Sequence, residues 1–293
     1  MAGYSQHFFS PEVANNSWSN IYSYIPEGAR VLDVGCATGN FGAALQDLKG
    51  CTVVGVDIDE DDVAEAATKL SAAYVLDITQ PEAAEKLGAF DIVIFADVIE
   101  HLPDATATLR AAKELLSEGG AIVYSIPNMA HLSVRLDLLA GRFPYTELGL
   151  LDRTHLHFYD RTAVHDVFAS AGLLINSELP TITGYPQELI SERLRALGLM
   201  GSPEFFALIS QTDGHVFQYI GSAGPIGVTP AVSSSERAVL PPLDEVLVYA
   251  ERVTQENAFH VTELNLAREQ LEAIRSRPVR SVLRGVKRRL LRR

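Results

Sequence analysis

The chain has 293 residues, of which 47% are apolar and 21% charged, with 37 acidic residues against 24 Lys and Arg. This composition is typical of a globular protein with one large domain or slightly more. No run approaches the ~18 apolar residues of a membrane span, residues 1–20 lack the pattern of a secretory signal, and two cysteines are too few for a disulfide framework. We therefore expect a cytoplasmic enzyme or binding protein.

Charge is unevenly distributed along the chain. Residues 275–293 carry nine basic residues and no acidic one, so the rest has 15 basic residues against 37 acidic, a formal charge of −22. Because an acidic body repels nucleic acid, we do not expect nucleic acid as a partner. The basic tail also contains valines and leucines, which suits peripheral contact with an anionic membrane, at its inner face, as well as a solvated end.

The first half of the chain alternates short β-branched runs with helical patterns. This alternation is typical of a parallel sheet with crossover helices, and the mostly apolar strands suit burial on both faces. We predict strands at 30–34, 52–57, 73–76, 91–95 and 121–125, and helices at 41–48, 61–70, 81–87 and 105–116.

The alternation lapses after residue 125. Residues 127–158 mix an apolar helical run at 132–139 with glycines and prolines, which predicts a lid over the sheet that forms the wall of an acceptor site. Beyond it we predict helices at 161–171, 188–197 and 203–210, and strands at 173–179 and 216–220.

The C-terminal part of the chain has a different pattern. Residues 223–242 are rich in Ser, Gly, Pro and Ala and are typical of a linker. In residues 243–293, an apolar seam with 3-4-3-4 spacing runs from Leu243 to Ile274 before the basic end. The seam predicts either self-association as a coiled coil or one amphipathic helix packed on its own domain.

The most informative segment runs from Val31 to Gly42 and joins a predicted buried strand to a helix. Its glycines follow the pattern Gly35-x-x-x-Gly39-x-x-Gly42, and Asp33 precedes them. A dinucleotide site would need Gly-x-Gly-x-x-Gly, and the Gly-Lys-Ser/Thr of a phosphate-binding P-loop is missing. A cofactor that lacks phosphates and has a cationic end fits this loop better.

Two further aspartates follow the next two strands. Asp57 ends the second strand, 22 residues after Gly35, near the ~20-residue spacing at which a carboxylate accepts ribose hydroxyls. Asp77 follows the third strand, where it can receive an adenine amino group. Single aspartates after strands are common, but this ordered set is a strong indication.

These residues, together with the segments 90–103 and 115–120, resemble the class I methyltransferases that depend on S-adenosylmethionine (SAM), including ubiquinone-pathway enzymes. The resemblance covers residues 28–222 and implies an α/β, Rossmann-like, doubly wound sheet of seven strands with the last strand antiparallel. In this family an aromatic, helical segment such as 1–27 often closes over the cofactor and the acceptor, whereas its composition fits a place in the core equally well. The helical tail after the domain is predicted by the 3-4-3-4 spacing and not by the resemblance. The resemblance also implies which residues contact each part of SAM. They are Asp33 for the ammonium group, Gly35, Ala37 and Gly39 for the rest of the methionine part, Asp57 and Ile58 for the ribose, and Asp77 and Ile78 for the adenine, with Ala96 as a further cofactor residue.

The acceptor side offers a second group of polar residues. Asp97, Glu100 and His101 follow the fourth strand at i, i+3 and i+4, so at a helix start they would share a face, and His155 follows in a later turn. His155 and His101 are the candidate catalytic residues. All four could hold Mg²⁺ or Mn²⁺, which resembles the arrangement in terminal 2′-O-methyltransferases of small RNAs. In metal-free relatives, Glu100 and His101 would instead brace the helix.

We interpret the chain as an enzyme that moves a methyl group from SAM to a hydroxyl of a small molecule or a glycan. The histidine-rich turn, the lid and the tail resemble bacterial methyltransferases that act on sugars of surface glycans. A prenylated phenol is a second possible acceptor and would explain a tail that contacts membranes. A non-enzymatic alternative is a catalytically silent SAM-fold scaffold in a glycan-processing complex. The intact Gly35, Gly39, Asp57 and Asp77 argue against it, because a scaffold does not need a cofactor site.

Overall fold

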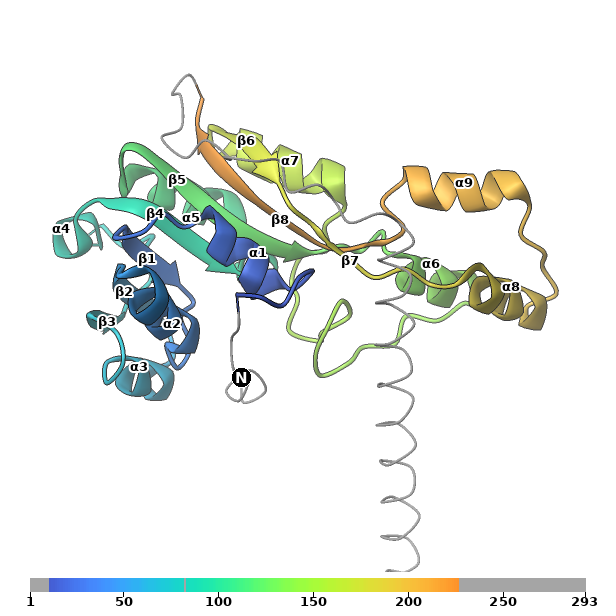
Figure 1. The fold of residues 1–293 in the computed structure, drawn as a ribbon, viewed down its shortest axis with the longest axis horizontal. Coiled ribbons are helices and arrows are strands. Elements are labelled where there is room, and N and C mark those ends of the chain that lie inside the picture. The colour runs from blue at the N-terminus through green and yellow to red at the C-terminus, as the bar shows by residue number, and fades with distance from the viewer. Residues whose placement is uncertain (1–10, 82, 227–293) are drawn as a thin grey trace, which may run out of the picture. The chain divides into compact units, whose positions relative to one another are not determined.

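Eight strands form one sheet in the computed structural model, which describes residues 11–81 and 83–226 (Figure 1). Their order is β3-β2-β1-β4-β5-β8-β6, and β7 pairs with β8. The strands are β1 (Arg30–Val34), β2 (Thr52–Asp57), β3 (Ala72–Val75), β4 (Phe90–Ala96), β5 (Leu116–Pro127), β6 (Leu173–Glu178), β7 (Thr181–Ile182) and β8 (Val216–Pro225).

This topology confirms the predicted sheet. β1 to β5 run parallel, and β8 lies antiparallel between β5 and β6, as expected for the last strand. The two-residue β7 is an addition that the sequence pattern did not indicate. β8 continues to Pro225 and so enters the segment expected to be a linker. Residues 227–242 of that segment and the whole tail, 243–293, lie outside the described residues.

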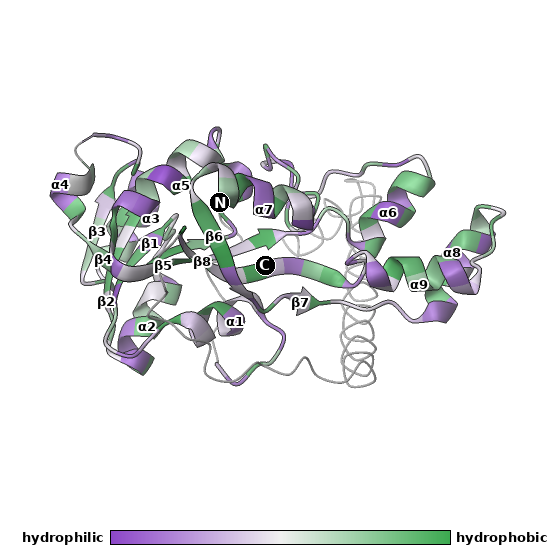
Figure 2. Ribbon diagram, turned by 90° about the horizontal axis from the view of Figure 1, so that it is seen from above, coloured by the Kyte–Doolittle hydropathy of each residue, from purple (hydrophilic) through white to green (hydrophobic). Residues whose placement is uncertain are grey.

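Helices cover both faces of the sheet. They are α1 (Ser17–Tyr24), α2 (Asn40–Lys49), α3 (Glu60–Ala66), α4 (Ala83–Leu87), α5 (Ala105–Glu114), α6 (Leu132–Leu139), α7 (Arg161–Ser170), α8 (Gln187–Ala196) and α9 (Pro203–Gln211), together with the 3₁₀ turn η1 (Ile99–His101). Figure 2 shows α1 and α2 on one side of the strands and α5 and α7 on the other.

The two faces have separate cores because side chains alternate along each strand. In β4, Ile92 and Ile94 pack with α1, α2 and α3, whereas Val93 and Phe95 pack with α4, α5 and α7. These β4 side chains are fully buried. α1 contributes Ile21 to the first core, so this part of the N-terminal segment is structural.

A third cluster lies beyond one end of the sheet. There α6, α8 and α9 pack against one another through Leu132, Leu136, Ile190, Leu194 and Ile209 (Figure 1). α6 follows the carboxyl end of β5, so this helical cap lies at the edge where the parallel strands end. Among the helices that the structure describes, none is long and apolar enough to cross a membrane.

Candidate functional site

The register of the strands brings the predicted site residues to one edge of the sheet. Val34 pairs with Val56 on one side and with Phe95 on the other, and Ala96 pairs with Ser125. The loops that follow β1, β2 and β4 therefore begin next to one another. In open α/β sheets, ligands bind outside the carboxyl ends of the strands, so this edge is the candidate site.

The glycine loop has a backbone that few residues other than glycine adopt. Gly35 and Gly39 have φ of 70° and 76°. A Cβ on Gly35 would approach Val98 Cγ2 to 2.6 Å, so this position excludes a side chain. Ala37 also has a positive φ, 44°, which is strained for alanine. Strain of this kind concentrates at ligand sites, and the resemblance places Ala37 beside the methionine part of SAM.

Asp57 connects the end of β2 to the glycine loop. Its Oδ2 accepts a hydrogen bond from the Ala37 backbone N–H at 2.9 Å, while its Oδ1 accepts from the N–H groups of Ile58 at 2.7 Å and Asp59 at 3.1 Å. A carboxylate has about four acceptor positions, so these bonds leave room at Oδ2 for one further donor. Asp57 can therefore accept one ribose hydroxyl while it holds the loop in place.

Asp33 lies beneath the loop with only 4% of its surface exposed. Burial and, to a smaller extent, the nearby Asp57 raise the pKa of Asp33 to about 7. Both causes disfavour the negative charge, and an ammonium group brought close to the carboxylate would reverse the effect. The side chain is therefore suited to respond to a cationic ligand.

The remaining predicted cofactor residues lie at the same edge in different environments. Ile58 is 76% exposed, which leaves an apolar surface beside Asp57. Asp77 is exposed, and its Oδ1 accepts hydrogen bonds from the backbone and the hydroxyl of Thr79. The Ile78 side chain is buried in the core, so its backbone is the part that could meet an adenine. Ala96 is half-buried at the end of β4.

Asp97 is placed differently from the prediction. It has a φ of 56° and precedes the 3₁₀ turn η1, so the α-helical spacing that would align it with Glu100 and His101 does not apply. Its Oδ1 accepts hydrogen bonds from Ser125 Oγ at 2.9 Å and Gln218 Nε2 at 2.8 Å. Asp97 therefore joins the ends of β4, β5 and β8 and is not part of the expected four-residue group.

The other three members of that group do come together. Glu100, His101 and His155 each offer one ligand atom, and these atoms all lie within 4.8 Å of one another. The His101 and His155 rings meet edge to face with centroids 4.8 Å apart. The backbone carbonyl of Glu100 accepts hydrogen bonds from the N–H groups of Leu156 at 2.9 Å and His157 at 3.1 Å, so η1 holds the lid segment that carries His155.

Burial changes the protonation of this cluster. Glu100 is 1% exposed, and burial, followed by the charge of Asp97, raises its pKa well above the usual range. Burial and the neighbouring His101 lower the pKa of His155, so its imidazole is neutral at neutral pH. Among the described residues, Glu100 Oε2 and His155 Nδ1 are buried atoms without a hydrogen-bond partner. Such unpaired polar atoms are costly in a core and are typical of functional sites.

The lid also places exposed apolar side chains beside the cluster, which the sequence pattern did not reveal. The Phe158 ring lies 6.3 Å from the His155 ring and 5.7 Å from that of Phe143, which in turn lies 5.3 Å from Tyr145. All three aromatic residues are more than one-third exposed. Only the succession of aromatic residues in 143–159 could have indicated them in the sequence. They form an apolar wall next to His155.

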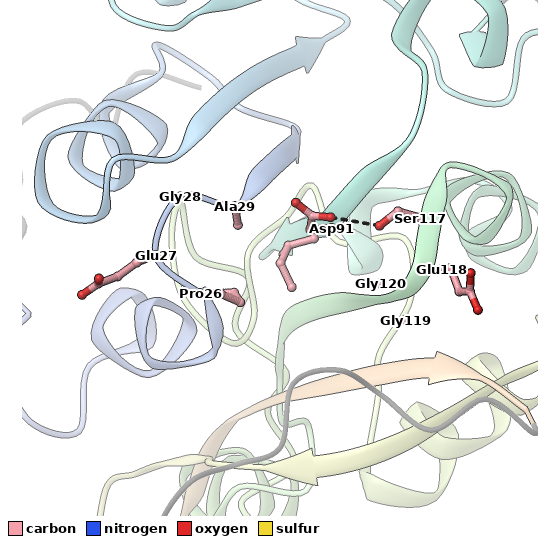
Figure 3. Close-up of a pocket in the computed structure, with 10 residues that line it drawn as sticks. Pro26, Glu27, Gly28, Ala29, Asp91, Ser117, Glu118, Gly119 and Gly120 are labelled. Carbon is pink, nitrogen blue, oxygen red and sulfur yellow. Dashed lines mark hydrogen bonds between the residues drawn. The ribbon is translucent and has the colours of Figure 1, made fainter.

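A cavity of about 330 Å³ lies at the opposite edge of the sheet (Figure 3). It is lined by Gly28, Ala29, Asp91 and residues 117–120, which are at the amino ends of β1 and β4 and the start of β5. The Asp91 carboxylate accepts hydrogen bonds there from Ser117 Oγ at 3.0 Å and Arg30 N at 2.9 Å. These bonds join strand beginnings, so we assign this cavity no part in cofactor binding.

Both the sequence and the fold are similar to those of known proteins. The chain is similar to a ubiquinone biosynthesis O-methyltransferase of Xanthomonas axonopodis pv. citri, at 32% identity over 123 residues, which are 40% of this chain and 51% of that protein. It is similar to the Vibrio parahaemolyticus enzyme of the same name, at 33% identity over 108 residues, 34% and 45% of the two chains. This chain thus spans about half the length of the curated relatives it matches.

The fold is shared with a solved SAM-dependent methyltransferase from Archaeoglobus fulgidus. The TM-score is 0.50 at 21% identity, over 73% of this chain and 94% of that chain. A family profile described as "Methyltransferase domain" matches residues 4–178, more than half of the sequence. The chain therefore belongs to the methyltransferase-domain family, among the class I SAM-dependent methyltransferases.

Proposed function

We propose that this chain transfers the methyl group of SAM to a hydroxyl of a small molecule. The observation that carries the proposal is the cluster of Glu100, His101 and His155 at the carboxyl end of β4, at the edge where the cofactor loops meet. Transfer from a sulfonium is an in-line displacement, so the protein mainly has to align the acceptor with the methyl carbon.

A hydroxyl acceptor also has to lose its proton, and the cluster offers two ways to help. His155 is neutral at neutral pH and can accept the proton directly, since its Nδ1 is unpaired among the described residues. Alternatively, the three groups can hold a cation that acidifies the hydroxyl. Either route suits an oxygen acceptor, which needs this help more than an amine does.

Two acceptor classes fit the proposal, a glycan hydroxyl and a prenylated phenol. The wall of Phe143, Tyr145 and Phe158 favours the phenol, because an aromatic ring beside an apolar chain buries its surface against such side chains. The names of the two relatives, ubiquinone biosynthesis O-methyltransferases, favour the phenol as well. A glycan would need polar partners from the lid, such as Arg142 and Arg153, which are already paired with Asp137 and Glu147.

The test has two stages, both with purified full-length protein. Calorimetric titration of SAM first establishes binding. The protein is then incubated with SAM and a panel of catechols, with and without isoprenoid chains, and sugars, and release of S-adenosylhomocysteine and gain of one methyl group are followed by mass spectrometry. Methylation of a hydroxyl supports the proposal. Absence of SAM binding would leave the catalytically silent scaffold, and transfer only to nitrogen or carbon would contradict O-methylation.

A further inference from the structure

The three-residue cluster at the end of β4 has the ligands of a transition-metal site. It contains two imidazoles and one carboxylate, from two segments separated by more than 50 residues. Glu100 is 1% exposed, and its Oε2 has no hydrogen-bond partner in the part of the chain that the structure describes. A buried carboxylate oxygen that lacks a donor, on a residue that lies next to two histidines, is an independent indication of a ligand site.

We propose that Glu100, His101 and His155 bind one divalent transition-metal ion of the Zn²⁺ or Co²⁺ type, in preference to Mg²⁺. The choice of metal follows from the ligands. Imidazole nitrogens suit zinc and its transition-metal neighbours, while Mg²⁺ prefers oxygen. The carboxylate of Asp97, which would have made the set richer in oxygen, is bonded to Ser125 and Gln218 instead.

The surroundings of His101 match those of a metal ligand. Its Nδ1–H donates to the Thr154 carbonyl at 3.1 Å, which leaves Nε2 with its lone pair free to coordinate. Histidines that bind metals commonly donate their second ring N–H to a carbonyl or carboxylate in this way. Asp152 in turn holds Thr154, accepting from its backbone N–H at 2.8 Å and its hydroxyl at 2.7 Å.

The three groups lie near, but not at, the spacing of bound ligands. In a tetrahedral site, ligand atoms about 2.1 Å from the ion are ~3.4 Å apart, whereas here the upper limit is 4.8 Å. Changes of side-chain torsion that bring the ligand atoms about 1 Å closer together would close the site. Three protein ligands also leave a coordination position open, as in catalytic zinc sites, where the acceptor oxygen could bind and become more acidic.

This inference names a cofactor for the site of the proposed function but is tested without turnover. Protein without an affinity tag is freed of metal with a chelator and titrated with Co²⁺, followed by visible absorption, and with Zn²⁺ and Mg²⁺, followed by calorimetry. Wild type is compared with Glu100→Gln, which retains the side-chain shape, and with His155→Ala. His157→Ala is the matched control, because His157 is an exposed histidine two residues away and outside the cluster.

We expect wild type and His157→Ala to bind one equivalent of Zn²⁺ or Co²⁺, and both cluster variants to bind at least about tenfold more weakly. Saturating Mg²⁺ should not displace Co²⁺. Calorimetric titration of SAM into each variant confirms that it is folded. Absence of a one-equivalent site in wild type, equal binding by His155→Ala, or displacement by Mg²⁺ would each overturn the inference.

The same preparations separate this inference from the proposed function. If metal-free protein binds no Zn²⁺ or Co²⁺ yet still methylates a hydroxyl, the metal site is refuted and His155 is left as the proton acceptor. If one equivalent of metal binds but no hydroxyl in the panel is methylated, the metal site stands and the proposed reaction fails.

Discussion

The cofactor half and the acceptor half of the candidate site are built in different ways. Around the glycine loop, Asp57 accepts hydrogen bonds from Ala37, 20 residues earlier, and from its own two successors. On the acceptor side, His101 is held by Thr154, 53 residues later, and η1 is bonded to the lid. The cofactor half is thus formed by neighbouring loops at the edge of the sheet. The acceptor half is formed by η1 together with a lid segment that is distant in the sequence.

This difference has a functional consequence. Local bonds shape the cofactor loops, so we expect them to retain their form when the lid is altered. The acceptor half depends on a lid segment with exposed apolar side chains, so it can vary with the substrate without disturbing the cofactor. Substitutions in the two halves should therefore affect different quantities, and each prediction below tests that separation.

The largest effect should come from His155→Ala. Because His155 either accepts the acceptor's proton or coordinates a cation, we expect the rate of methyl transfer to fall about 10²- to 10⁴-fold. SAM affinity should stay within about twofold of wild type. Single-turnover kinetics with SAM and the acceptor found in the panel give the rate, and calorimetry gives the affinity. Equal losses in His155→Ala and the control His157→Ala would contradict the assignment.

Asp57→Asn should have the converse effect. The amide retains the shape of the side chain but places an NH₂ group against either the Ala37 N–H or the N–H groups of Ile58 and Asp59. The loops would lose hydrogen bonds to a charged acceptor, each worth ~1.5–3 kcal/mol, and with them the shape to which SAM binds. We therefore expect SAM affinity, measured by calorimetry, to fall about 100-fold. The exposed Asp47 in α2 provides the control Asp47→Asn. Unchanged SAM affinity in Asp57→Asn would show that the cofactor half lies elsewhere.

The protonation of Asp33 predicts that SAM binding depends on pH. Burial, aided by Asp57, raises its pKa to about 7, so the free protein carries the neutral acid below that pH. The ammonium of SAM favours the carboxylate, and affinity should therefore rise about tenfold from pH 6 to pH 8. Asp33→Asn should bind more weakly and without this dependence. A wild-type profile as flat as that of Asp33→Asn would contradict the prediction.

The titration of Asp33 should affect stability in the opposite direction: SAM affinity rises with pH, whereas the free energy of unfolding falls. The raised pKa means that folded Asp33 holds its proton more tightly than the unfolded chain does. Its contribution to the free energy of unfolding is therefore fully present below the unfolded pKa, near 4, and is lost as the pH rises through about 7. In Asp33→Asn, this part of the pH dependence of urea unfolding should disappear.

The smallest effect is expected in the apolar wall. Phe158→Ala removes a ring that contacts both His155 and Phe143. An aromatic contact contributes ~0.5–1.5 kcal/mol, so KM for an aromatic acceptor should rise about two- to tenfold while SAM affinity is retained. Leu174→Ala, at an exposed position on β6, is the control. If KM changed equally in both variants, the wall would have no part in acceptor binding.

Much of the cofactor half could be predicted from the sequence. The bounds of β1 and β2 are identical to the predicted ranges, and Asp57 and the glycine loop lie where the motif indicated. Apolar runs buried on both faces and a glycine that excludes a side chain leave direct traces in the sequence. The positive φ of Ala37 left no such trace in the sequence, because the loop around it imposes this conformation.

The acceptor half could be predicted only in part. The residues Glu100, His101 and His155 were correctly grouped, but Asp97 was not, since a helical spacing was assumed where the chain forms a 3₁₀ turn. The aromatic wall was missed because Phe143, Tyr145 and Phe158 follow no single periodicity. Their proximity depends on a lid that forms isolated bridges, Thr146 with Asp152 and Asn128 with Tyr159.

The sequence by itself thus determined the parallel sheet and the polar residues at the strand ends, because these depend on local patterns of burial and turn formation. The reversed last strand was expected only from the resemblance to class I methyltransferases. The tertiary structure alone decided which of those residues face one another. It bonded Asp97 to β5 and β8 and left Glu100 buried against two histidines. Contacts across more than 50 residues depend on packing that closes a long loop, and no local pattern encodes them.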